Sequence, residues 1–143
     1  MFAAFPLLAL PVLAYNLLAL TVAGGFHSEA ASGRMSSQLF SVRTASHTAW
    51  PVSIGDILLA AALVILFVEL LKSTASRHVA IINHSLSMVL FIACLVEFLL
   101  FPAFATSAFF LLTLMVLLDV LAGFIVTIIA ARRDVDVMRP DRG

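Results

Sequence analysis

The chain has 143 residues, of which 63% are hydrophobic and only 11% are charged, and its mean hydropathy is +1.16. Water-soluble domains carry charge on about a quarter of their residues, so this composition excludes an ordinary soluble domain. The eight basic residues balance the eight acidic ones, which leaves no excess charge to attract a nucleic acid. We therefore expect one integral membrane domain over residues 1–143, with no nucleic-acid partner.

Apolar segments of membrane length dominate the chain. A helix rises about 1.5 Å per residue, so about 20 apolar residues cross a hydrocarbon core of about 30 Å. Segments rich in Leu, Ile, Val, Ala and Phe approach this length at residues 2–23, 54–71, 79–101 and 107–131. They predict an all-α bundle of four transmembrane helices, with an extramembrane loop at 24–53 and a tail at 132–143.

The first apolar segment could also be read as a secretory signal peptide. However, it has no Lys or Arg before its apolar run, whereas signal peptides begin with a basic region. Asn16 also interrupts the apolar run. Both features favour a transmembrane helix that stays in the protein.

Basic residues are divided unevenly between the two sides of the predicted bundle. With four spans, both termini and the connection between the second and third helices share one side of the membrane. That side holds six of the eight basic residues: Lys72, Arg77, Arg132, Arg133, Arg139 and Arg142. The other side holds only Arg34 and Arg43. Because positively charged flanks stay in the cytoplasm, we expect both termini inside, in a multi-pass protein of the bacterial inner (plasma) membrane.

Short polar sequences mark where the helices begin and turn. The connection at residues 73–76 is short enough to make the second and third helices antiparallel neighbours. Ser53 and Asp56 have the spacing of a capping box, and Thr106 is placed to cap the fourth helix. Trp50 is expected to be an interfacial anchor. For the rest of the outer loop, a short surface helix or strand is expected, with a disordered loop as the alternative.

Asp119 lies near the middle of the fourth segment, where an ionised aspartate costs about 2.5 to 3.5 kcal/mol to insert. Asp119, Gly123, Thr127 and Ala131 follow one another at intervals of four, which puts a stripe of small and polar residues on one side of the helix. Such a stripe lets another helix approach closely. We favour a packing seam with a neutral, hydrogen-bonded Asp119 over proton or substrate handling, because no basic residue is evident at its depth.

The third segment carries a polar face. Its members fall within about 40° of one another on a helical wheel: Asn83, Ser87, Cys94 and Glu97. Glu97 lies at a depth similar to Asn16 of the first segment and near Asp56 of the second. These side chains are expected to form a polar cluster in the outer half of the bundle. A role in holding the helices together is favoured over a coupling-ion site.

The remaining ionisable residues offer no metal or cofactor site. Glu69 lies near the cytoplasmic boundary with Lys72 and Arg77, which indicates a solvated ring of ion pairs. His84 lies inside the third helix, off its polar face, and no second histidine is placed to complete a haem site. Cys94 is the single cysteine, which excludes an intrachain disulfide and a multi-cysteine metal site. The sequence predicts neither a metal nor a cofactor.

Two classes of function fit these features. The first is a non-catalytic scaffold or accessory subunit in the lipid membrane, which forms a homo-oligomer or joins a larger membrane complex through its polar and small-residue faces. The alternative is a small oligomeric transporter or proton-conducting channel that uses Asp119 and Glu97. An enzyme is not expected, because the spacing of His27, Glu29 and His47 in the outer loop matches no mechanism.

Two short sequences accompany the pattern of four helices. These are His-Thr-Ala-Trp-Pro at residues 47–51, before the second segment, and Leu-Leu-Asp-Val at 117–120, in the fourth. With them, the whole chain resembles the small four-helix inner-membrane proteins of bacteria. The resemblance implies a fold and a location, and it implies no catalytic or binding residue.

Overall fold

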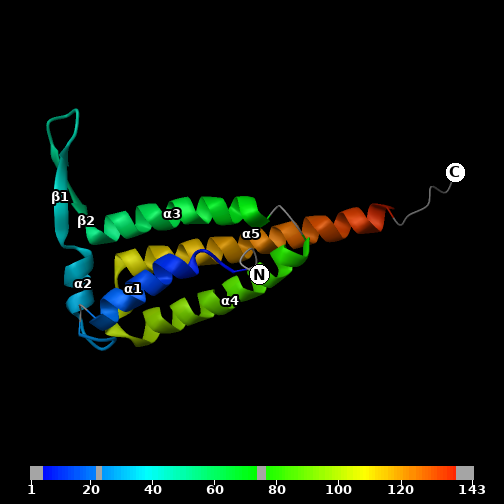
Figure 1. The fold of residues 1–143 in the computed structure, drawn as a ribbon, viewed down its shortest axis with the longest axis horizontal. Helices are drawn as coiled ribbons and strands as arrows, with labels where there is room; N and C mark the ends of the chain where they lie inside the picture. Colours follow the sequence, from blue (N-terminus) through cyan, green and yellow to red (C-terminus); the bar gives the residue numbers. More distant parts are fainter. Residues whose placement is uncertain (1–4, 22–23, 74–76, 138–143) are drawn as a thin grey trace.

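The computed structural model describes residues 5–21, 24–73 and 77–137, without the side chains of residues 73, 77–80, 127 and 130–137. The described chain is mostly helical (Figure 1). Its elements, in order, are α1 (Ala9–Thr21), α2 (Ala30–Met35), β1 (Gln38–Arg43), β2 (Ala49–Ser53), α3 (Ile54–Ser73), α4 (Arg77–Leu100), the 3-10 helix η2 (Pro102–Phe104) and α5 (Ser107–Val137).

Three of the described helices are long and apolar enough to cross a membrane. The apolar stretches are Ile54–Lys72 in α3, Ile81–Leu100 in α4 and Ser107–Val126 in α5. Most of their large apolar side chains point outward from the bundle and are exposed, as expected when lipid surrounds the helices. The prediction of membrane-length helices is confirmed for these three.

The first apolar segment forms the shorter helix α1, which begins only at Ala9. The prolines in this segment give a physical reason. Pro6 disfavours helical geometry in the residue before it. Pro11 lies within the first turn of α1, where its missing N–H is tolerated because first-turn N–H groups have no partner inside the helix. Residues 1–4 and 22–23 of the predicted segment are outside the described residues.

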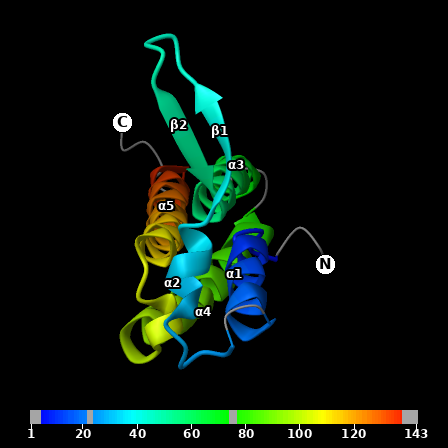
Figure 2. The ribbon, with the colours of Figure 1, turned by 90° about the vertical axis from the view of Figure 1, so that its left-hand side faces the viewer.

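The last helix, α5, lies at the centre of the arrangement. It packs extensively against both α3 and α4, while α3 and α4 touch each other much less. Figure 1 shows why: α3 and α4 are close where the chain turns between them and then diverge, with α1 and α5 occupying the space that opens. The view along the helices in Figure 2 shows α1 and α5 on opposite sides of this space. The two consecutive helices run antiparallel, as predicted, but α5 holds them together.

The two ends of the bundle differ. At one end, which we call the terminal end, the first described residues lie near the end of α3, and α5 continues past the other helices (Figure 1). α5 runs to Val137, beyond the predicted boundary at residue 131, because the sequence has no helix-stopping Gly or Pro before Pro140. At the other end, which we call the hairpin end, lie α2, η2 and the β-strands.

At the hairpin end, aromatic rings close the core. Tyr15, Phe104 and Phe109 are fully buried. The ring centroid of Phe109 is 4.7 Å from those of both Tyr15 and Phe104. Tilted and edge-on ring pairs at this spacing contribute about 0.5 to 1.5 kcal/mol beyond the area they bury. These contacts tie α1 to the connection between α4 and α5.

The outer loop contains both a short helix and strands. β1 and β2 pair as an antiparallel hairpin, with Val42 opposite Trp50 and Phe40 opposite Val52, and a register shift between Gln38 and Phe40. The hairpin projects sideways from the bundle, across the direction of the helices (Figure 1). In Figure 2, which looks along the helices, the strands of the hairpin are seen face-on.

The predicted capping residues occupy their expected positions. The hydroxyl oxygen of Ser53 accepts the N–H of Asp56 at 3.2 Å, and the Asp56 carboxylate accepts the N–H of Ser53 at 2.8 Å. This reciprocal pair is a capping box that starts α3 immediately after β2. The Thr106 hydroxyl oxygen accepts the N–H of Phe109 at 3.1 Å at the start of α5. Both predicted caps are confirmed.

Candidate functional site

Buried polar side chains join the helices at successive levels of the bundle, and they form the candidate functional site. From the terminal end to the hairpin end, we name them the Glu69 cluster (Glu69, Lys72, Asn83), the Asp119 pair (Ser87, Asp119) and the Glu97 pair (Asn16, Glu97). Each includes an acidic residue. In a membrane-length helix an acid needs a partner, because an isolated charge is costly there.

The Glu69 cluster connects the start of α1 with α3 and α4. The Glu69 carboxylate accepts the amide of Asn83 at 2.5 Å and the Leu7 N–H at 3.0 Å. Lys72 forms an ion pair with it, 2.9 Å from Glu69 Oε1, and also donates to the Phe5 carbonyl at 2.7 Å. The carboxylate thus satisfies groups from three segments that are far apart in sequence.

Burial of the Glu69 cluster differs from expectation. Glu69 is fully buried and Asn83 nearly so, so the prediction of a solvated ion-pair ring around Glu69 is wrong. The reason is that α1 begins against the end of α3 and covers the carboxylate, with the Leu7 N–H bonded to it. The predicted partner Lys72 is correct. The side chain of Arg77 is outside the described residues.

The Asp119 pair links α4 with α5. The Ser87 hydroxyl donates to Asp119 Oδ2 at 2.6 Å, and both side chains are buried, with Asp119 only 4% exposed. Asp119 lies within electrostatic range of Glu69, Lys72 and His84. The expectation that no basic residue lies near its depth is therefore wrong. Counting along α5 alone could not show that Lys72 of α3 comes close.

The small residue of the α5 stripe receives a side chain of α4. A Cβ at Gly123 would overlap the His84 ring, and this ring also packs edge-on against Phe124 with centroids 4.4 Å apart. Both ring nitrogens of His84 are buried without a hydrogen-bond partner among the described residues. The stripe at Asp119 and Gly123 is thus occupied by α4 of the same chain. The side chain of Thr127, the next predicted member, is outside the described residues.

The Glu97 pair joins α1 to α4. The amide of Asn16 donates to Glu97 Oε2 at 3.2 Å and to the Val12 carbonyl of its own helix, also at 3.2 Å. The structure therefore brings Asn16 and Glu97 together as predicted. Asp56 is not part of the group, since its carboxylate is exposed and caps α3 through Ser53.

Sequence reasoning missed one polar contact in the core. The Tyr15 hydroxyl donates to the Ala103 carbonyl at 3.0 Å and lies 2.7 Å from the Thr106 hydroxyl. Tyr15 is the only tyrosine of the chain and lies in an apolar segment. A buried tyrosine needs a partner for its hydroxyl, and this need was the available signal. The sequence did not show that the partner is the α4–α5 connection.

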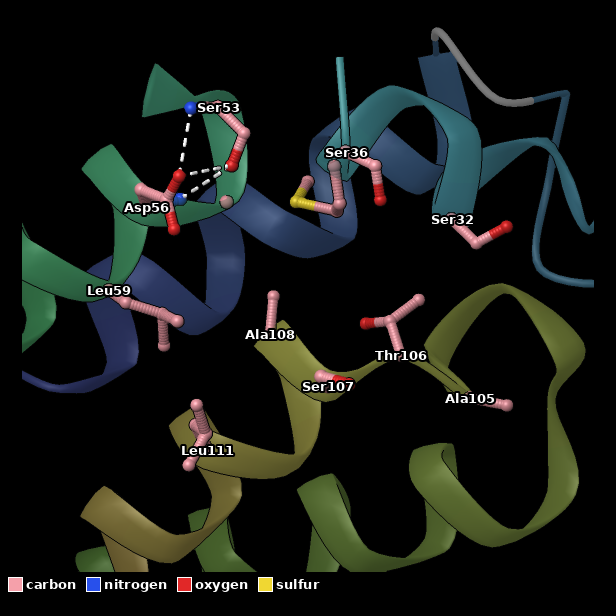
Figure 3. Close-up of a pocket in the computed structure, with 12 residues that line it drawn as sticks. Ser32, Ser36, Ser53, Asp56, Leu59, Ala105, Thr106, Ser107, Ala108 and Leu111 are labelled. Atoms are coloured by element: carbon pink, nitrogen blue, oxygen red, sulfur yellow. Dashed lines mark hydrogen bonds between the residues drawn. The ribbon is translucent and has the colours of Figure 1, made fainter. Parts of the chain in front are cut away.

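A cleft of about 440 Å³ opens at the hairpin end between α2 and the starts of α3 and α5 (Figure 3). Figure 3 shows hydroxyl side chains along both sides and the Asp56 carboxylate held by Ser53. The Ser32 hydroxyl donates to the Glu29 carbonyl, and the Thr106 hydroxyl caps α5. Local backbone caps and turns thus explain these polar groups, which do not form a nucleophile with an adjacent base.

The chemistry open to the buried groups is proton exchange and hydrogen bonding. Among the described residues, no group of three or more His, Cys, Asp and Glu side chains is placed to hold a metal ion. Cys94 is a buried free thiol that belongs to the apolar core. The Asp119 pair and the Glu69 cluster together place two acids, an amine and an imidazole near one another in the half of the bundle toward the terminal end.

Comparison with known proteins adds no functional residue. The chain matches no family model, no curated protein and no solved structure. The fold therefore defines its class by physical properties. It is a mostly helical chain with three described helices long and apolar enough to cross a membrane, which indicates a membrane protein. Its polar residues are concentrated where these helices meet.

Proposed function

We propose that the protein crosses the bacterial inner membrane four times, with α1 as the fourth span and both termini in the cytoplasm. The distribution of basic residues supports this arrangement, since six of the eight are near the termini or the connection between α3 and α4. The described start of the chain and the end of α5 lie at the same end of the bundle (Figure 1), which fits an even number of crossings.

A reporter that is active only outside the cytoplasm tests the topology when it is fused after Gly143. We expect no activity from this fusion. A second fusion in the tip of the hairpin, at Ser46, is the matched control and is expected to be active. Activity after Gly143 would overturn the proposed orientation.

We further propose that the protein is a non-catalytic scaffold or accessory subunit, which assembles with copies of itself or within a larger membrane complex. The observation that carries this proposal is the bond between Ser87 and Asp119. The most deeply placed acid of α5 is buried and held by a neighbouring helix, as expected of a group that fixes helix packing. The Glu69 cluster and the Glu97 pair follow the same rule.

The polar faces serve contacts within the chain, so the surface for assembly must be sought elsewhere. The outward faces of the long helices carry large apolar side chains, such as Val64 of α3, Val89 of α4 and Ile125 of α5, each more than half exposed. Between helices in lipid, van der Waals packing drives association. We propose that one of these faces contacts the next subunit.

Single cysteines test this assembly. In a Cys94→Ala background, Val64→Cys, Val89→Cys and Ile125→Cys each report on one helix face after oxidation in native membranes. We expect cross-linked dimers from one face and little from the others, together with an assembly of defined mass in native mass spectrometry. A monomer in mild detergent and in lipid nanodiscs, with no cross-link and no companion protein, would overturn the proposal.

Proton conduction by an oligomer is the second candidate function, and the proximity of Asp119 to Glu69, Lys72 and His84 favours it. These groups could pass protons toward the terminal end, since intramembrane acids often form such relays. The Glu97 pair would serve the other half of the bundle. Four helices enclose little space, so this function also needs an oligomer.

Proton flux into liposomes that contain the purified protein tests this second candidate. Asp119→Asn and Glu97→Gln should each abolish most of the flux if these acids carry protons. Glu29→Gln is the matched control, because Glu29 is exposed and lies outside the long helices. Flux that is absent in the unaltered protein, or unchanged in both variants, would exclude this function.

A further inference from the structure

The β-hairpin has two chemically different faces. Residues opposite each other on antiparallel strands share a face, and successive residues alternate between faces. The pairs Phe40–Val52 and Val42–Trp50 therefore lie on one face, which we call the apolar face. The other face carries Ser41, Pro51, Arg43 and Ala49. Leu39 lies at the register shift and is not counted in either set.

The burial of β2 shows which way the apolar face points. Val52 is only 7% exposed, whereas its neighbour Pro51, on the other face, is exposed. Val52 lies two residues before α3, at the base of the hairpin, where the sheet meets the helices. The face that includes Val52 is thus turned toward the helical bundle, and the face with Pro51 is turned away from it.

Beyond its base, the apolar face is uncovered. Phe40, Val42 and Trp50 are 50%, 43% and 55% exposed. A two-stranded hairpin is marginally stable in water, and large apolar groups left on one face would make it a site of aggregation. This face therefore needs a cover that the chain itself does not supply among its described residues.

The orientation of the hairpin indicates what covers it. The strands project across the helix direction (Figure 1) and are seen face-on along the helices (Figure 2). When α3, α4 and α5 cross a bilayer, the hairpin consequently runs along its surface with the apolar face toward the lipid. The level also fits, because β2 leads through the capping box directly into the membrane-length stretch that begins at Ile54.

We propose that the apolar face of the hairpin rests on the bilayer, at the boundary between headgroups and acyl chains of the leaflet at the hairpin end. Trp is enriched at this depth, since its ring is amphipathic. The four residues of the face are uncharged, while the nearby cation, Arg43, is on the opposite face toward water. The hairpin thereby acts as a lateral anchor that fixes how the bundle is rotated and tilted in the membrane.

Trp50 is the only tryptophan of the chain, so its fluorescence reports on this face alone. The full-length protein is reconstituted into vesicles of phosphatidylethanolamine and phosphatidylglycerol that contain lipids brominated at defined acyl positions. We expect blue-shifted Trp50 emission, quenching that is strongest with bromine near the headgroup, and weak quenching by aqueous iodide. Red-shifted emission that iodide quenches and brominated lipid does not would overturn the proposal.

Variants on the two faces give matched controls. Val42→Asp puts a charge on the apolar face opposite Trp50, whereas Ser41→Asp puts the same charge on the other face, one residue away. We expect Val42→Asp to shift the emission to longer wavelength and to lose most of the lipid quenching, with Ser41→Asp unchanged. Equal effects of the two variants would contradict the assignment of faces. The unaltered protein tests the proposal without relying on either variant.

A second copy of the chain, covering the same face, would also shield Trp50 from water. Diluting the protein with excess lipid distinguishes the two. Contact with lipid predicts that quenching by brominated lipid is independent of the protein-to-lipid ratio. Shielding from iodide that is lost on dilution, without lipid quenching at any ratio, would show a protein contact and overturn the proposal. This readout needs no assembly, so it is separate from the test of the scaffold function.

Discussion

The ring of His84 occupies the space in which a side chain at residue 123 would begin. The contact joins α4 to α5 one turn from the bond between Ser87 and Asp119. A glycine at this position lets a bulky aromatic ring enter the helix interface, where a larger residue would force the helices apart. This relationship makes Gly123 the most sensitive small residue of the described stripe.

Gly123→Ala should destabilise the bundle despite the higher helix propensity of alanine. The new Cβ overlaps the His84 ring, and overpacking of this kind costs about 1 to 3 kcal/mol. The free energy of unfolding can be measured by titrating the purified protein with SDS in mixed micelles. A companion variant, His84→Ala, opens the space, so the double variant should be more stable than Gly123→Ala alone.

Gly33→Ala is the control for that measurement. Gly33 lies in the short helix α2, and a Cβ there would meet no atom within 4 Å. Its replacement should therefore leave the unfolding free energy unchanged or raise it slightly. A loss of stability at residue 33 as large as that at residue 123 would contradict the steric explanation.

The bond between Ser87 and Asp119 should show energetic coupling in a double-mutant cycle of Ser87→Ala and Asp119→Ala. Interhelical hydrogen bonds in membranes are worth about 0.6 kcal/mol on average and up to about 1.7 kcal/mol. We expect a coupling in this range by SDS titration. Ser85→Ala is the matched control, because the Ser85 hydroxyl is exposed and bonds only to the Ile81 carbonyl of its own helix. Coupling between residues 85 and 119 would argue against a specific pair.

Removal of the Glu69 carboxylate should be the most damaging single change among these. Glu69→Ala leaves Asn83, Lys72 and the Leu7 N–H without their common acceptor. Breaking a buried pair by removing one partner costs about 3 to 5 kcal/mol. Glu69→Gln keeps an acceptor oxygen and should cost less, while the exposed Glu29→Ala should be neutral. Thermal unfolding followed by circular dichroism ranks the three variants, and an equal ranking of Glu69→Ala and Glu29→Ala would refute the role of burial.

Tyr15→Phe should remove a hydroxyl without disturbing the aromatic packing. The variant leaves the Ala103 carbonyl without this donor and the Thr106 hydroxyl without its neighbour, which should cost about 1 kcal/mol. Thr21→Val, on the same helix, removes a hydroxyl that bonds only to the Leu17 carbonyl and is exposed. In the same thermal assay, we expect Tyr15→Phe to unfold at a lower temperature than Thr21→Val.

The features that the sequence could predict are those that depend on local patterns. Long apolar runs predicted the three long helices, since the length of a span is a matter of rise per residue. The caps at Ser53 and Thr106 followed from spacing alone. The pairing of Asn16 with Glu97 could be predicted because both are polar residues at matching depths in an apolar environment.

Other features depend on which helices become neighbours, and spacing along one helix does not contain this information. Glu69 was expected to be solvated, but α1 covers it. Lys72 approaches Asp119 because α5 packs against α3. In the outer loop, a helix and a strand were both open, and the chain uses each in turn, with the hairpin formed by pairing across the tip.

The divergence of α3 and α4 has a consequence for biosynthesis. These helices emerge from the ribosome as one hairpin, yet most of their packing is with α5, the helix that is made last. Their interface is incomplete until α5 enters the membrane and its Asp119 meets Ser87. Final closure of the bundle is therefore a late event of synthesis, and a chain that stops before α5 would leave its membrane helices without their common neighbour.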